Sequence, residues 1–169
     1  STPGVSALAT TWHLAEGNGG AFDSYYAVVN PQATAQTVSV TYRHENGILY
    51  TGTVAVGATS RATFTIPSWV PDGNLGMTVS APLGIAVERT MYGGTSWTVG
   101  HAGVASPIAG STWRFAEGNA AIFDTYFAVV NIGGIAGTAA SGEVHILVED
   151  AAAARSALTD AGIQVGADN

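Results

Sequence analysis

The chain has 169 residues, of which 47% are hydrophobic and only 10% are charged, and its formal net charge is −7. Disordered chains combine low hydrophobicity with high charge, so this composition predicts a folded protein. Five arginines stand against twelve acidic residues. With no basic cluster, the sequence argues against binding to nucleic acid or to an anionic membrane surface.

Three further features narrow the class of protein. Cysteine is absent, which excludes disulfides and thiolate metal sites. No apolar run reaches the roughly 18 residues that a membrane span requires, so no span is predicted. The opening Ser1-Thr2-Pro3-Gly4 lacks the regions of a signal peptide, as expected for a processed chain or an excised fragment.

The first predicted feature along the chain is a repeat. Residues 12–30 read WHLAEGNGGAFDSYYAVVN and residues 113–131 read WRFAEGNAAIFDTYFAVVN, with twelve of nineteen positions identical. The offset of 101 residues matches the size of a β-sandwich domain. We therefore predict a complete module at residues 1–110 and a shortened second copy, 113–131, within residues 111–169.

The first module contains only strand signals. Its glycine-rich stretch Gly17-Asn18-Gly19-Gly20 is predicted to be a hairpin loop, and Asn46-Gly47 is a strong turn signal between two strands. Short strands at this spacing predict a mainly β fold, an antiparallel β-sandwich of immunoglobulin-like size. We predict strands at residues 37–42, 48–56, 61–66, 76–80 and 85–92, with Pro82-Leu83-Gly84 as a turn between the last two.

The C-terminal part has a different pattern. Residues 132–142 are predicted to be a flexible linker. A strand at 144–148 precedes an alanine-rich helix at 149–161, and a short strand at 163–165 follows. We therefore predict a small C-terminal β-α-β segment.

Several motifs in order resemble a known family. The segments are Trp12–Gly17, Phe22–Tyr25, Asn30-Pro31, Ser60-Arg61, Val87–Tyr92 and Gly100-His101. Together, across about residues 10–131, they resemble the "W-F-A-E-G" tandem repeat of secreted and cell-surface bacterial proteins. The resemblance implies an extracellular β-domain without an assigned reaction. Residues 143–165 are similar to the second half of an ACT-like β-α-β unit, from which no ligand-binding role is carried over.

Four carboxylates recur at identical spacing, Glu16 with Asp23 and Glu117 with Asp124. They could form an acid–base pair or a calcium site. We favour turn residues whose carboxylates accept hydrogen bonds from backbone or arginine, because an active site duplicated in every repeat would be unusual.

A further pair of charges lies within a predicted strand. Glu88 and Arg89 are adjacent there, so their side chains point to opposite faces and cannot pair with each other. We expect Arg89 to pair with Glu16 or Asp23, because a buried arginine needs a carboxylate. These five acidic residues (Glu16, Asp23, Glu88, Glu117 and Asp124) and Arg89 are all predicted to have a structural role.

No catalytic residue, cofactor or metal site is predicted. The four histidines are far apart, and no nucleophile motif is present. The remaining candidates are aromatic residues that could stack on sugar rings or anchor a protein contact. The predicted binding residues are Trp12, Tyr26, Trp69 and Trp97.

The sequence therefore predicts a non-enzymatic extracellular or cell-surface module with a structural, adhesion or assembly role. The alternative is a carbohydrate- or cell-wall-binding module. The shortened second copy leaves three outcomes open. Its strands could complete the first sandwich, pack with the C-terminal segment, or pair with another copy of the chain by strand addition or head-to-tail packing.

Overall fold

The computed structural model describes residues 4–93, 96–110 and 128–132. Contacts divide the chain into two compact units, and everything described below lies in the first, which holds residues 1–109 and 128–135. Its elements are the strands β1 (Ala9–Leu14), β2 (Asn18–Gly19), β3 (Asp23–Asn30), β4 (Gln36–His44), β5 (Leu49–Val56), β6 (Ser60–Thr65), β7 (Gly73–Gly93) and β8 (Val99–Val104). The predicted mainly β class is confirmed, and among the described residues no helix is long and apolar enough to cross a membrane.

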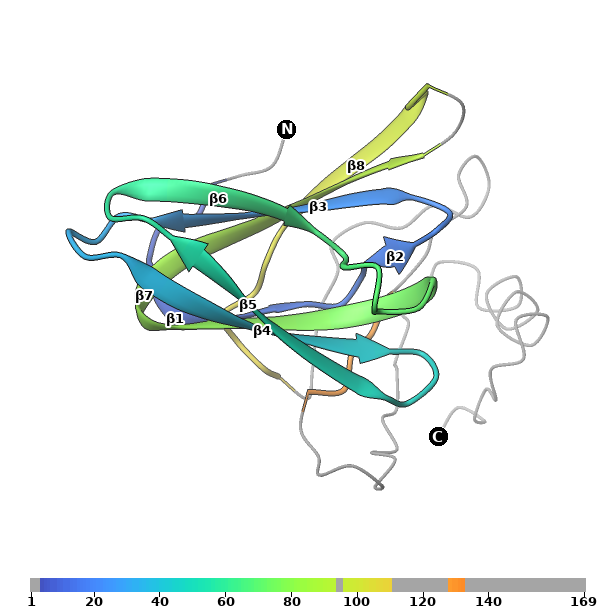
Figure 1. The fold of residues 1–169 in the computed structure, drawn as a ribbon, viewed down its shortest axis with the longest axis horizontal. Helices are drawn as coiled ribbons and strands as arrows, with labels where there is room; N and C mark the ends of the chain where they lie inside the picture. The colour runs from blue at the N-terminus through green and yellow to red at the C-terminus, as the bar shows by residue number, and fades with distance from the viewer. Residues whose placement is uncertain (1–3, 94–95, 111–127, 133–169) are drawn as a thin grey trace, which may run out of the picture. The chain divides into compact units, whose positions relative to one another are not determined.

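The long strand β7 organises one curled antiparallel sheet (Figure 1). Its first half pairs with β1 and β4, and β5 lies beyond β4. Its second half pairs with β3 and β8, and β6 lies beyond β3. We call the first set of strands the first wing and the second set the second wing.

The continuity of β7 corrects the sequence prediction of two strands with a turn at 82–84. The ladder with β4 ends at Ser80 and the ladder with β3 ends at Ala86, so Pro82 lies where neither pairing requires its missing N–H. At this bend the backbone forms hydrogen bonds with side chains in place of a neighbouring strand. The N–H of Leu83, for example, donates to the side-chain amide oxygen of Gln36 over 2.8 Å. The chain bends without leaving an extended conformation.

The remaining predicted strands match β4, β5 and β6 within one residue or two at each end. The Asn46-Gly47 turn is present, with Gly47 at a φ of 82° and its N–H bonded to the carbonyl of His44. The predicted hairpin loop at 17–20 is wrong. β1 and β3 are not neighbours, and β2 within that stretch pairs with the beginning of β7.

Both wings contribute to one hydrophobic core. Alternation dictates this: in β4 every second side chain is buried, among them Val38, Val40 and Tyr42. Tyr26 and Val28 of β3 belong to the same cluster. One seam between the wings is closed by backbone, because His13 of β1 exchanges two hydrogen bonds with Ser106, just beyond β8.

Of the second repeat copy, only residues 128–131 fall within the described part, and they carry no strand. A Cβ at Gly76 of β7 would overlap the Cγ2 of Val130, so the two residues are in contact. Val129 is 71% exposed, whereas its first-copy counterpart Val28 is fully buried. The rest of that copy, the linker and the predicted C-terminal β-α-β segment lie outside the described residues.

Candidate functional site

Two of the four predicted binding residues are corrected by their burial. Trp12 is 1% exposed, and its indole N–H donates to the carbonyl of Ile85 over 2.8 Å. Tyr26 is fully buried, and its ring stacks on Phe64 with centroids 5.4 Å apart. Both lie on inward positions of their strands, so neither can contact a ligand at the surface.

The recurring Glu16 forms an ion pair with Arg89. Arg89 is 4% exposed, and its Nη1 lies 2.9 Å from Glu16 Oε2 and also donates to the backbone carbonyl of Glu16. Its Nη2 lies 2.8 Å from His101 Nδ1, which must therefore accept this hydrogen bond. The three side chains join the loop after β1 to β7 and β8, across the same seam that His13 and Ser106 close.

The other predicted ionic residues behave differently. Glu88 is exposed on the face of β7 opposite to Arg89, as the alternation predicted. Glu88 and Asp23 were also predicted to form structural ion pairs. That prediction is wrong for both, because neither forms an ion pair with any described residue. Asp23 instead accepts a hydrogen bond from the indole N–H of Trp97. Glu117 and Asp124 lie outside the described residues.

Other recurring residues also support the fold. A Cβ at Gly17 would overlap the hydroxyl of Tyr26 and approach Leu75, so only glycine fits there. The hydroxyl of Ser24 donates to the backbone carbonyl of Asn18 and receives its N–H. The repeated motif is therefore largely a set of close contacts that hold β1, β2 and β3 together.

Trp69, half exposed, packs against the first wing. Its indole lies against Gly52, where an added Cβ would approach it to 3.3 Å, and it makes ring contacts with Tyr42 and Tyr50. These positions face inward on β4 and β5. Trp69 thus covers the core beside β5, at the edge of the sheet opposite to the closed seam.

Trp97 belongs to an exposed aromatic cluster. It is 54% exposed, it stacks on Tyr92 with centroids 5.3 Å apart, and it meets Tyr25 edge-on. Phe22, 41% exposed, lies over Gly93 at the end of β7. We call Phe22, Tyr25, Tyr92 and Trp97 the aromatic cluster.

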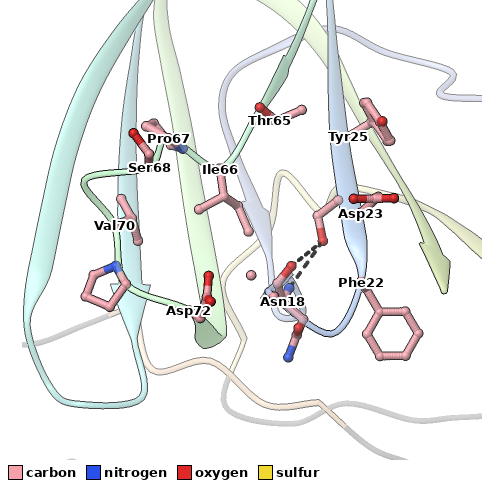
Figure 2. A pocket seen from close by; sticks show the side chains of 14 residues that line it. Asn18, Phe22, Asp23, Tyr25, Thr65, Ile66, Pro67, Ser68, Val70 and Asp72 are labelled. Atoms are coloured by element: carbon pink, nitrogen blue, oxygen red, sulfur yellow. Dashed lines mark hydrogen bonds between the residues drawn. The ribbon is translucent and has the colours of Figure 1, made fainter. Parts of the chain in front are cut away.

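An open cavity of about 510 Å³ adjoins this cluster and shares Phe22 and Tyr25 with it (Figure 2). Its walls are the segment from β2 to the beginning of β3 and the loop between β6 and β7. Residues with polar side chains on these walls are Asn18, Asp23, Ser24, Thr65, Ser68 and Asp72. Trp69 is not among the lining residues, although its neighbours Ser68 and Val70 are.

A hydrogen-bond network fixes the loop that forms one wall. Asn74 donates from its backbone and its side-chain amide to the carboxylate of Glu45, and these bonds hold the pKa of Glu45 below its usual range. Asn18 donates to the side-chain oxygen of Asn74 over 2.8 Å. Gly73, at a φ of 139°, leaves space for Glu45 and His44. Asn18 lines the cavity, whereas Asn74, Glu45 and Gly73 do not, so the wall is positioned largely by residues outside the cavity.

Sequence reasoning found Trp97 but missed its setting. Phe22, Tyr25 and Tyr92 lie in motifs that the sequence already marks, but their meeting with Trp97 gave no local signal, because it depends on the pairing of β3 with β7. Asp72, in the loop before β7, was not predicted as a site residue. Among the described residues, no group of three or more histidines, cysteines or acidic residues could hold a metal ion.

Comparisons with known proteins add only the fold. No family model matches the chain, and no curated protein matches it. The crystal structure of Thermotoga maritima 1070 is similar with a TM-score of 0.53 at 9% identity, over 59% of this chain and 94% of that one. The Anabaena sensory rhodopsin transducer has a TM-score of 0.43 at 18% identity, over 50% of this chain and 98% of that one.

Proposed function

We propose that the chain is a non-enzymatic module of a secreted or cell-surface bacterial repeat protein, with a structural, adhesion or assembly role. The observation that supports this best is where the recurring residues lie. Trp12, Glu16 and Gly17 each make contacts that hold the fold together, and so does the hydroxyl of Ser24, which the second copy keeps as Thr125. A repeat that preserves residues of this kind is typical of a scaffold. On this proposal the two wings act as the layers of a β-sandwich.

A variant pair tests the scaffold role of the recurring carboxylate. Glu16→Gln removes the charge that pairs with Arg89, while Glu88→Gln removes a neighbouring exposed charge on the opposite face. A hydrogen bond to a charged group contributes about 1.5–3 kcal/mol, and partial exposure of Glu16 reduces this to about 1–2 kcal/mol. Urea unfolding should show that loss for Glu16→Gln and a change within about 0.5 kcal/mol for the control. Equal stabilities would contradict the scaffold role.

The proposed partner includes a second copy of the chain. Val129 corresponds in the repeat to a core valine, yet no described residue buries it. An exposed apolar segment with strand-forming neighbours favours association. We therefore infer self-assembly through the second repeat copy, by strand addition or head-to-tail packing.

Light scattering over a concentration series tests the self-assembly. The wild-type mass should rise with concentration, and Val129→Asp should remain monomeric. Ile108→Asp, which replaces a similarly exposed residue outside the repeat, should behave as wild type. A monomeric mass throughout, with residues 113–131 protected from hydrogen exchange, would rule self-assembly out.

A further inference from the structure

The aromatic cluster presents ring faces beside a cavity with polar walls. Trp97 is the most exposed of its rings, and its orientation is fixed by Tyr92, Tyr25 and the carboxylate of Asp23. A cavity of about 510 Å³ is within the range of sites for small ligands, roughly 300–1,000 Å³. The rings and the cavity form one continuous surface, because Phe22 and Tyr25 belong to both.

The backbone that carries Trp97 is unusual. Ser96 and Trp97 have φ values of 60° and 56°, a conformation that costs about 1–2 kcal/mol for a residue with a side chain. Glycine or asparagine would adopt it more readily, and a bulky residue there is rare. Strain of this kind concentrates at binding sites, where it serves to present a side chain. The backbone thus adopts a costly conformation at a residue whose side chain points outward and is more than half exposed to water.

The polar groups define the chemistry of the ligand. Asn18 and Ser24 are bonded to each other and to neighbouring loops, so they shape the wall. The carboxylate of Asp72 and the second oxygen of Asp23 accept no hydrogen bond from the described residues. These oxygens can accept hydrogen bonds from a ligand rich in hydroxyl groups.

We propose that this surface binds a neutral carbohydrate chain. A pyranose ring offers a C–H face that packs on an aromatic ring and an edge of hydroxyls that donate to carboxylates, which is the pairing this surface provides. The carboxylates of Asp23 and Asp72 have no cationic partner among the described residues, and together with a chain charge of −7 they disfavour acidic polysaccharides. The site extends the scaffold role proposed above and does not depend on it.

Affinity electrophoresis and calorimetry test the site with defined probes. The full chain is titrated with neutral glucan, mannan and chitin oligosaccharides, with polygalacturonate, and with a polyarginine peptide. We expect binding to at least one neutral oligosaccharide, with a Kd that changes less than twofold between low and high salt, because no ion pair is involved. Binding to no neutral probe, or stronger binding to polygalacturonate or polyarginine, would overturn the proposal.

Three variants at two tryptophans locate the binding. Trp97→Ala should weaken the interaction at least tenfold, as expected for a central aromatic contact, and Trp97→Phe should fall between this variant and wild type. Trp69→Ala removes an equally exposed indole that does not line the cavity, so it should bind as wild type after its folded fraction is checked. Unchanged binding by Trp97→Ala would refute the assignment and leave the scaffold proposal untouched.

Discussion

Replacing Tyr26 with phenylalanine should stabilise this protein. The Tyr26 hydroxyl is buried. Burial raises its pKa more than the nearby hydroxyl of Ser24 lowers it, and no hydrogen bond of normal geometry to a described residue satisfies the Tyr26 hydroxyl. It lies against the backbone of Gly17, where no side chain could be placed. The ring itself, stacked on Phe64, stays in place in the variant. The second repeat copy carries Phe127 at the equivalent position.

The size of the effect follows from two opposing contributions. An unsatisfied buried hydroxyl costs about 1–3 kcal/mol. Removing one oxygen leaves a small void, which costs about 0.5 kcal/mol. We expect a net gain of about 1 kcal/mol at neutral pH, or roughly 3–5 °C in the unfolding midpoint of a domain this size.

Alkaline pH should enlarge the difference. Burial raises the pKa of Tyr26 to about 12, above the ordinary value of 10.0. The folded state therefore retains a proton that the unfolded state loses, and this contribution to stability is full below pH 10 and is lost as the pH rises towards 12. Tyr26→Phe removes that dependence, so its advantage should widen by about 1–3 kcal/mol across the window.

Urea unfolding at pH 7, 10 and 11.5 measures both effects. Tyr42→Phe is the matched control, because burial also raises the pKa of Tyr42 to about 12 while its hydroxyl is not among the unpartnered buried atoms. The control should gain nothing at pH 7. If Tyr26→Phe loses more than about 1 kcal/mol at pH 7, the hydroxyl has a bonding partner and the reasoning fails.

Three further predictions concern stability. Gly17→Ala should lower the free energy of unfolding by about 2 kcal/mol, because the added methyl group overpacks against Tyr26 and Leu75. Most of this loss should be recovered in the Tyr26→Phe background, which removes the nearest atom. If the effects of the two substitutions are simply additive in a double-mutant cycle, the contact between Gly17 and the hydroxyl is contradicted. Trp69→Ala should cost about 2 kcal/mol in urea unfolding, because its ring covers Gly52 and the core residue Tyr42. Trp97→Ala should cost less than about 1 kcal/mol, because its equally exposed ring packs instead on Tyr25 and Tyr92 of the exposed aromatic cluster. Equal losses would refute the distinction. Glu45 has a lowered pKa, so its contribution is full above the ordinary value of 4.5 and is lost as the pH falls through the lowered value. The midpoint of Glu45→Gln should therefore fall less steeply than that of wild type below pH 4.5, and parallel curves would argue against the Asn74 contacts.

Local pattern alone predicted the strands that became β4, β5 and β6. Their alternation of small polar and β-branched residues is a property of neighbouring positions, and the Asn46-Gly47 turn is equally local. The opposite orientations of Glu88 and Arg89 also follow from alternation. The need of Arg89 for a carboxylate follows from charge burial. These features required no knowledge of which strands are neighbours.

Tertiary structure decided which of two local possibilities was realised. Alternation gives a strand two faces but does not say which face the other wing covers, so Trp12 and Tyr26 read as binding residues although both lie in the core. Arg89 pairs with Glu16 because the loop after β1 lies on the face of β7 from which the Arg89 side chain projects. Asp23 accepts a hydrogen bond from Trp97 instead. Pro82 lies within a continuous strand because both ladders stop beside it. The aromatic cluster exists only because β7 pairs with β3, and pairing between distant segments leaves no local trace in sequence.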